Sequence, residues 1–355
     1  MPYLQHYHLK DNVEEQYICT KPFEWIDISS DKVDMCCPTW INKPLGNILS
    51  DSLEDIWNGI DAQEIRQSMH DGSFRYCNDL CPFKNTRTGP VQSKEKVLNN
   101  PREDERIKNA IAKELTILPY GPLAINAAYD RSCNLSCPSC RVKNIMASGK
   151  EKEKALRLQD AMLNECMDDC YHLYITGSGD PFGSPTFFKL LKEFNPDEFP
   201  ELNFFTLHTN GQLWTPESWD KISNIHHLVR AAHISIDACS PETYAINRRG
   251  GDWDKLMENL DFIRDIKNKQ GFSVTISFVV QQNNWREMKD FIELGSWCDL
   301  VFFGKLADWG TWSEEELHSR QVYRTDHPEH REFVDFISDP VFNTPKVWSR
   351  SLLEL

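Results

Sequence analysis

The stretch LAINAAYDRSCNLSCPSC, residues 123–140, joins an apolar strand candidate to three closely spaced cysteines. Cys133, Cys137 and Cys140 lie within eight residues, so one loop can present three thiolates to one face of a [4Fe–4S] cluster. The fourth iron then has no protein ligand, and an open coordination position is typical of catalytic metal sites. A zinc knuckle fits this pattern poorly, because zinc usually takes four ligands, often in paired Cys-x2-Cys units.

Short apolar segments alternate with amphipathic ones on the C-terminal side of this stretch. Strands are predicted at residues 123–128, 172–176, 203–208, 232–237, 273–280 and 300–306, and helices at 185–194, 216–225, 253–267 and 285–294. Alternating β and α units favour a parallel sheet. Six units are fewer than the eight of a complete barrel. We therefore expect an α/β fold, a partial (β/α)6 TIM-like barrel, whose active site lies at the C-terminal ends of the strands.

Polar and glycine residues follow the predicted strands in the chain. The relevant segments are TGSGDP (176–181), HTNG (208–211), ISIDA (234–238) and RRGG (248–251). Glycine lets a backbone approach a ligand closely, a carboxylate can accept a hydrogen bond from an ammonium group, and a guanidinium matches a carboxylate through paired donors. Each segment alone is a weak signal, and an ordinary strand-to-helix turn or a solvated helix end also explains it.

The cysteine loop after a first strand, followed by these strand ends in order, resembles the radical SAM superfamily over about residues 122–310. The resemblance implies that the open iron chelates S-adenosylmethionine (SAM). It also implies reductive cleavage of a C–S bond, which gives a 5′-deoxyadenosyl radical that abstracts hydrogen from carbon. Ser139 departs from the aromatic residue that usually precedes the third cysteine, but this difference removes no ligand.

The resemblance also assigns roles in SAM binding. Ser178, Gly179 and Asp180 occupy the place of the Gly-Gly-Glu segment that holds the amino group of SAM. Ser235 and Arg248 are expected to bind its carboxylate or ribose, with Arg249 as the alternative to Arg248, and Val279 is expected to contact adenine; a buried strand explains Val279 equally well. Cys239 is either a hydrogen-atom donor to a substrate radical or a small buried residue.

A second group of cysteines precedes the first one, at positions 19, 36, 37, 77 and 81. Between them, Ser52 is expected to cap a helix whose face includes Leu53, Ile56, Trp57 and Ile60. The pattern resembles the auxiliary-cluster modules called SPASM or twitch domains, although those usually follow the radical SAM core. The resemblance implies a second [4Fe–4S] cluster on Cys19, Cys36, Cys77 and Cys81. Cys37 remains an alternative to Cys36, and a structural zinc site an alternative to the cluster.

The composition limits the class of protein. The chain has 355 residues and a net charge of -15, which argues against nucleic-acid binding. No apolar run reaches the roughly 20 residues of a membrane span, and no signal peptide is visible at the start, so a cytoplasmic location is expected. We divide the chain into an auxiliary-cluster domain (1–90), a linker (91–121), a radical SAM core (122–310) and a C-terminal tail (311–355).

The expected function is that of a radical SAM enzyme acting on a carbon of a peptide, sugar or related metabolite. Epimerisation, dehydrogenation and cross-linking share the same first step, so the reaction subtype stays open. The alternative is a non-catalytic scaffold with zinc or closed iron–sulfur sites. The chemistry implies a low-potential electron donor of the flavodoxin or ferredoxin type. Such donors are usually acidic, so a local basic docking patch is expected, and the sequence does not locate it.

Overall fold

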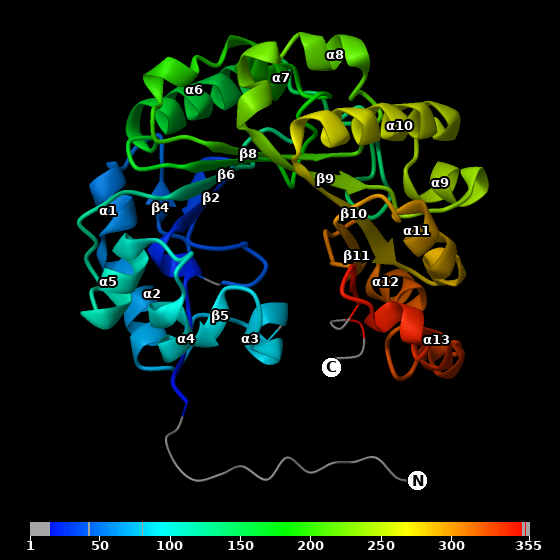
Figure 1. Ribbon diagram of the computed structural model, residues 1–355, viewed down its shortest axis with the longest axis horizontal. Coiled ribbons are helices and arrows are strands. Elements are labelled where there is room, and N and C mark those ends of the chain that lie inside the picture. Colours follow the sequence, from blue (N-terminus) through cyan, green and yellow to red (C-terminus); the bar gives the residue numbers. More distant parts are fainter. Residues whose placement is uncertain (1–14, 42, 80, 350–351, 353–355) are drawn as a thin grey trace.

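A curved, largely parallel sheet organises the molecule. The computed structural model describes residues 15–41, 43–79, 81–349 and 352. Six strands of the sheet run parallel in sequence order: β6 (Ala124–Ala127), β7 (His172–Ile175), β8 (Phe204–Thr209), β9 (Val229–Ser235), β10 (Ser273–Val280) and β11 (Leu300–Lys305). Helices lie on the convex side of the sheet, whose arch stays open (Figure 1). The prediction of an α/β fold with an incomplete barrel is confirmed.

The alternation of residues along each strand explains this layering. In β7, Leu173 and Ile175 are fully buried, whereas His172 and Tyr174 are half-buried. Successive side chains of a strand point to opposite faces, so the aliphatic side chains pack under the helices and the polar ones line the concave face. The helices of this layer are α6 (Gly149–Glu165), α7 (Pro185–Glu193), α8 (Pro216–Asp220), α9 (Pro241–Asn247), α10 (Trp253–Gln270) and α11 (Met288–Leu294).

The N-terminal part continues the same sheet. Strand β2 (Trp25–Ser29) pairs in parallel with β6, and β3 (Lys32–Asp34) and β4 (Gly46–Asn47) follow it antiparallel. Strand β1 (Tyr17–Cys19) pairs instead with β5 (Val91–Ser93), which lies in the segment assigned to a linker. That segment also holds α4 (Lys94–Asn99) and α5 (Glu105–Ala112). Periodicity alone does not reveal these long-range pairings.

Three more helices of the N-terminal part are α1 (Leu53–Trp57), α2 (Ile60–His70) and α3 (Pro82–Thr86). Ser52 caps α1 as expected, since its hydroxyl accepts from the Asp55 amide at 3.1 Å. Ile56 and Trp57 are buried, but the inclusion of Ile60 in the same buried face was wrong: Ile60 begins α2 and is 67% exposed. Because α1 ends at Trp57 and α2 begins only at Ile60, the 3.6-residue period of the first helix does not extend to Ile60.

Buried polar contacts tie α1 and α2 to the segment before β6. The Trp57 indole donates to the Tyr120 carbonyl at 2.7 Å, and Asn58 bonds both backbone groups of Leu118. Arg66, fully buried, donates to the carbonyls of Pro22 and Thr116. Burial lowers the pKa of Arg66 to about 9. These contacts fix the N-terminal part on the core.

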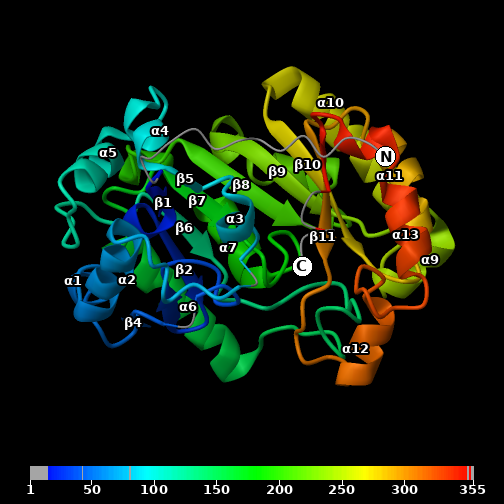
Figure 2. The same ribbon diagram turned by 90° about the horizontal axis from the view of Figure 1, so that it is seen from below.

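The C-terminal residues are bound to the far edge of the sheet. Strand β12 (Val347–Trp348) pairs in parallel with β11, and α12 (Glu314–Arg320) and α13 (His330–Ile337) lie on this side of the molecule, opposite α1 and α2 (Figure 2). Glu329 accepts hydrogen bonds from Gln282, Trp285 and Arg286. These bonds, above all the one from Gln282, lower the pKa of Glu329 to about 2. The 3-10 helices are η1 (Lys21–Phe23), η2 (Pro196–Glu198), η3 (Ser223–Leu228), η4 (Trp285–Glu287) and η5 (Pro340–Asn343). In the part of the chain that is described, no helix combines the length and apolar character needed to cross a membrane.

Candidate functional site

The loop between β6 and α6, residues 128–148, is called the cluster loop below because it carries Cys133, Cys137 and Cys140. Cys133 and Cys137 are buried, and Cys140 packs against them at the edge of the same small group. The Cys133 sulfur accepts from the Leu135 amide and from the Asn210 side chain, both at 3.5 Å. Three cysteines from one loop therefore come together next to the end of β8.

Each of these three sulfurs has an N–H donor. The Cys140 sulfur accepts from the Arg141 guanidinium at 3.3 and 3.4 Å, and the Cys137 sulfur from Arg248 at 3.7 Å. Burial raises the pKa of the Cys133 thiol to about 11 and also raises that of Cys137. Such thiols give up their proton when a metal takes its place. Donors directed at anionic sulfur fit the thiolate ligands of an iron–sulfur cluster.

Arg141 links the cluster loop to the turn after β7. Its guanidinium donates to the Arg131 carbonyl at 2.7 Å and to the Ser178 carbonyl at 2.8 Å, in addition to the Cys140 sulfur. The side chain is buried. The sequence analysis did not single out this residue. Its position directly after the third cysteine was the available signal.

The turn after β7 packs tightly on the cluster loop. A Cβ atom on Gly179 would lie 2.4 Å from the Asp130 carbonyl oxygen, so only glycine fits there. The Ser178 hydroxyl donates to the Ala128 carbonyl at 2.6 Å. Two of the three residues expected to hold the amino group of SAM thus contact the cluster loop directly.

Asp180, the third of them, is already saturated with hydrogen bonds. One carboxylate oxygen accepts from the amides of Phe182 and Gly183, and the other from the Thr209 hydroxyl and the Asn210 amide, all at 2.8–3.0 Å. The side chain is 1% exposed. In this structure Asp180 joins the turn after β7 to the HTNG segment after β8, and it offers no free oxygen to an ammonium group.

Arg248 and Arg249 have different environments. Arg248 forms an ion pair of 2.8 Å with buried Asp237, contacts the Cys137 sulfur, and retains a buried Nε–H with no partner among the described residues. A free buried donor of this kind suits an anionic oxygen such as the carboxylate of SAM. Arg249 is exposed and donates to Ser136 and to the Val142 carbonyl. The geometry therefore favours Arg248 for the expected contact.

Ser235 belongs to a hydrogen-bonded chain on the concave face of the sheet. His208 contacts the Ser235 hydroxyl at 2.9 Å and the Tyr174 hydroxyl at 3.0 Å, and Ser277 donates to Ser235 at 3.2 Å. His233 stacks on His208 with ring centroids 4.3 Å apart. Burial lowers the pKa of His233 to about 4 and that of His208 as well, so both rings are neutral at pH 7. Tyr174, His208, His233 and Ser277 were not predicted as site residues. The only signal for them was their alternation with apolar residues along a strand.

Val279 and Cys239 are both close to Asp237, the first through a contact between neighbouring strands and the second in sequence. The Val279 amide donates to Asp237 at 2.8 Å, and its side chain packs on the main core. The Cys239 amide donates to Glu287. Burial, followed by the nearby acids Asp290, Glu287 and Glu293, raises the pKa of the Cys239 thiol to about 11. Cys239 therefore faces η4 and α11, which do not contribute to the cluster loop.

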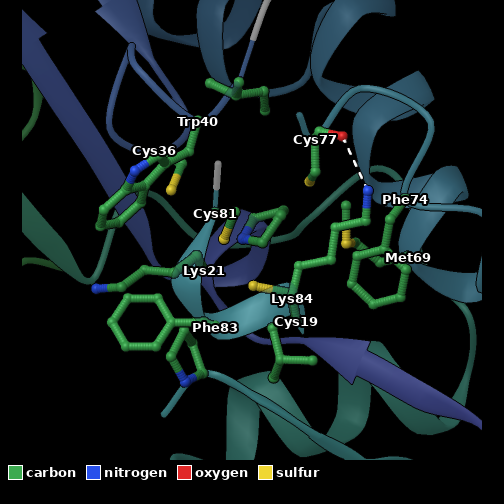
Figure 3. Close-up of a pocket in the computed structure, with 14 residues that line it drawn as sticks. Cys19, Lys21, Cys36, Trp40, Met69, Phe74, Cys77, Cys81, Phe83 and Lys84 are labelled. Atoms are coloured by element: carbon green, nitrogen blue, oxygen red, sulfur yellow. Dashed lines mark hydrogen bonds between the residues drawn. The ribbon is translucent and has the colours of Figure 1, made fainter. Parts of the chain in front are cut away.

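The other group of cysteines lines a pocket between β1, α2 and α3, which contains Cys19, Cys36, Cys77 and Cys81 (Figure 3). It encloses about 510 Å³, part of it open to solvent, and its other walls are mainly apolar, with Trp40, Met69, Phe74 and Phe83 among them. Burial raises the pKa of Cys36 to about 12 and that of Cys77 to about 11. Four cysteines around one space, Cys81 buried and the other three partly buried, fit a closed iron–sulfur cluster.

Cys36 and Cys37 are distinguished by their surroundings. Cys36 lines the pocket, whereas the Cys37 sulfur contacts the Thr39 hydroxyl at 3.4 Å and is not among the lining residues. Two lysines flank the pocket: Lys21, whose charge offsets part of the rise that burial causes in the pKa of Cys36, and Lys84, which donates to the Cys77 carbonyl at 3.4 Å (Figure 3). Positive charge next to the sulfurs suits an anionic cluster. Among the residues described, no three His, Cys, Asp or Glu side chains are grouped to hold a single metal ion.

Solved structures similar to this chain include radical SAM proteins. SuiB from Streptococcus suis has 13% identity and a TM-score of 0.41, over 68% of this chain and 51% of that one. The anSMEcpe protein with bound AdoMet has 20% identity and a TM-score of 0.38, over 64% and 61%. TsrM from Kitasatospora setae, a radical S-adenosylmethionine methyltransferase, has 13% identity and a TM-score of 0.37, over 49% and 35%. The chain thus spans only part of the length of these structures, and no curated protein matches it.

Two family models match the chain itself. Residues 130–295 match the radical SAM superfamily, and residues 19–82 match the SPASM iron–sulfur cluster-binding domain. The first match implies a [4Fe–4S] cluster and SAM, and the second implies additional iron–sulfur ligation. Both matched ranges contain the cysteines described above. The chain therefore contains a radical SAM domain, and its SPASM iron–sulfur cluster-binding domain lies on the N-terminal side of it.

Proposed function

We propose that this protein reductively cleaves SAM and uses the resulting 5′-deoxyadenosyl radical to abstract hydrogen from a carbon of a peptide, sugar or related metabolite. The observation that carries the proposal is the set of three cysteines in the cluster loop, each with an N–H donor directed at its sulfur. When bound at Cys133, Cys137 and Cys140, a [4Fe–4S] cluster supplies the electron for this cleavage.

The remaining residues position the reactants. Arg141 holds the cluster loop against the turn after β7, and Asp180 holds that turn against the segment after β8. Arg248, fixed by Asp237, presents its free Nε–H to an acceptor close to Cys137. Ser235, His208 and Tyr174 supply hydroxyl and imidazole groups on the concave face for polar groups of SAM or substrate.

The test is SAM cleavage by the whole chain. Protein reconstituted anaerobically with iron and sulfide, then reduced with dithionite, is expected to convert SAM to 5′-deoxyadenosine and methionine in equal amounts, measured by liquid chromatography and mass spectrometry. Protein that binds only zinc, does not bind SAM and forms no 5′-deoxyadenosine would instead be the non-catalytic scaffold.

We also propose that Cys19, Cys36, Cys77 and Cys81 hold a second [4Fe–4S] cluster, which relays electrons or stabilises the fold. The neighbouring Cys36 and Cys37 give a matched pair of variants. Cys36→Ala is expected to lower the iron content from about eight to about four atoms per chain, because one ligand leaves the pocket. Cys37→Ala is expected to retain all the iron. Iron assay and cluster absorbance compare the two, and loss of iron from Cys37→Ala alone would reverse the assignment.

A further inference from the structure

The part of this acidic chain around the cluster loop is locally basic. The chain has a net charge of -15, yet residues 131–152, called the basic segment here, contain five cationic residues and a single acidic one, Glu151. The cations are Arg131, Arg141, Lys143, Lys150 and Lys152. This segment includes all three cysteines of the cluster loop. A local positive surface therefore lies next to the candidate cluster site.

Four of these cations are available to a partner. Arg131, Lys143, Lys150 and Lys152 are exposed, and within the described parts of the chain none of them is in an ion pair. By contrast Lys154, just beyond the segment, is paired with Asp31 at 3.0 Å. Unpaired charges of one sign raise the local potential and attract a partner of opposite sign.

Two apolar side chains lie among these charges. Val142 is 70% exposed and Met146 is 44% exposed, and both belong to the long coil between β6 and α6. An apolar centre with a charged rim is the usual arrangement of a protein–protein interface. Cys140 is itself only half-buried, so the surface of the basic segment lies close to a sulfur of the candidate cluster site.

We propose that the basic segment is the docking surface for a small acidic electron-transfer protein of the flavodoxin type. This inference rests on the proposed function, since a cluster that cleaves SAM must first be reduced. One electron passes from the anionic flavin hydroquinone, which becomes the neutral semiquinone and keeps its proton, to the cluster at Cys133, Cys137 and Cys140. No bond of the chain is made or broken. The net charge of the whole chain makes a nucleic-acid partner a poor fit.

Binding of oxidised flavodoxin tests the surface without any turnover. Isothermal titration calorimetry at low ionic strength would measure Kd for oxidised flavodoxin with reconstituted wild type, with K143E/K150E/K152E and with the control K113E/K221E/K269E. The control changes three exposed lysines elsewhere and shifts net charge equally. We expect Kd to rise at least tenfold in the first variant, because like charges then face each other, and to stay within about twofold in the control. Equal weakening in both variants would mean that only net charge matters and would overturn the proposal.

Wild type provides a second measurement that does not depend on how the variants fold. Raising the ionic strength from about 0.05 to about 0.5 M shortens the Debye length and should weaken flavodoxin binding severalfold. An unchanged Kd would contradict electrostatic docking.

The activity of the variant gives a third measurement. 5′-Deoxyadenosine formation by K143E/K150E/K152E should fall with flavodoxin as reductant but not with dithionite. An equal fall with both reductants would assign the segment to the SAM site and overturn the docking role. Absence of cleavage by wild type with dithionite would refute the proposed function while leaving the binding result intact.

Discussion

Replacing Cys133, Cys137 and Cys140 with alanine is expected to abolish SAM cleavage while leaving iron in the other cysteine pocket, which contains Cys19, Cys36, Cys77 and Cys81. The three sulfurs lie in one loop, and each has its own N–H donor. Groups that act as one unit are not additive, so a single substitution costs nearly as much as all three. We therefore expect Cys137→Ala alone to lower 5′-deoxyadenosine formation by about 10³-fold or more. The measurement is product formation with dithionite in excess.

Cys298→Ala provides the matched control for this experiment. Cys298 is also buried, but it packs in the main hydrophobic core away from the small group that holds Cys133 and Cys137. Its loss removes one thiol of similar burial and should leave cleavage within about twofold of wild type. The triple variant should keep roughly half of the iron and absorbance. If it lost the second cluster as well, the assignment of two separate sites would be incorrect.

Substituting Asp180 is expected to destabilise the protein as well as to stop the reaction. Its carboxylate accepts four hydrogen bonds from two segments of the chain, the turn after β7 and the end of β8, while 1% exposed. Removal leaves buried donors without partners, at a cost of about 1–3 kcal/mol for each donor that water does not reach. We expect Asp180→Ala to lower the free energy of unfolding by about 3–5 kcal/mol, measured by anaerobic denaturant titration.

Asp180→Asn separates this positioning role from direct binding of SAM. The amide keeps the shape of the side chain but directs an NH2 group at two donors, so it should destabilise the protein nearly as much as alanine does. A residue whose only partner was the ammonium group of SAM would instead raise KM for SAM and leave the unfolding curve unchanged. A normal unfolding curve for both variants would therefore restore the role that the family resemblance implies.

The sequence was informative where the signal is local. The Cys-x3-Cys-x2-Cys spacing and the alternation in segments such as β7 depend on residues a few positions apart. The first predicted the radical SAM domain and the second the fold class, and both predictions are confirmed. Arg141 was not predicted, although it follows the third cysteine, because its role depends on bonds to the carbonyls of Arg131 and Ser178. The lack of a free oxygen on Asp180 depends on contacts with residues about 30 positions away. Such contacts are not visible in composition, spacing or periodicity.

The pairing of β2 with β6 has a consequence for how the protein matures during synthesis. Asp27 in β2 contacts Asn126 in β6, 99 residues later. At roughly 5–20 residues per second, a ribosome needs ~5–20 s to reach that partner. Meanwhile β1, which carries Cys19, can find β5 as soon as residue 93 has emerged. The pocket that contains Cys19 can therefore begin to form before β6, the strand that leads to the cluster loop, has emerged. We expect its metal centre to be the first of the two that can be assembled.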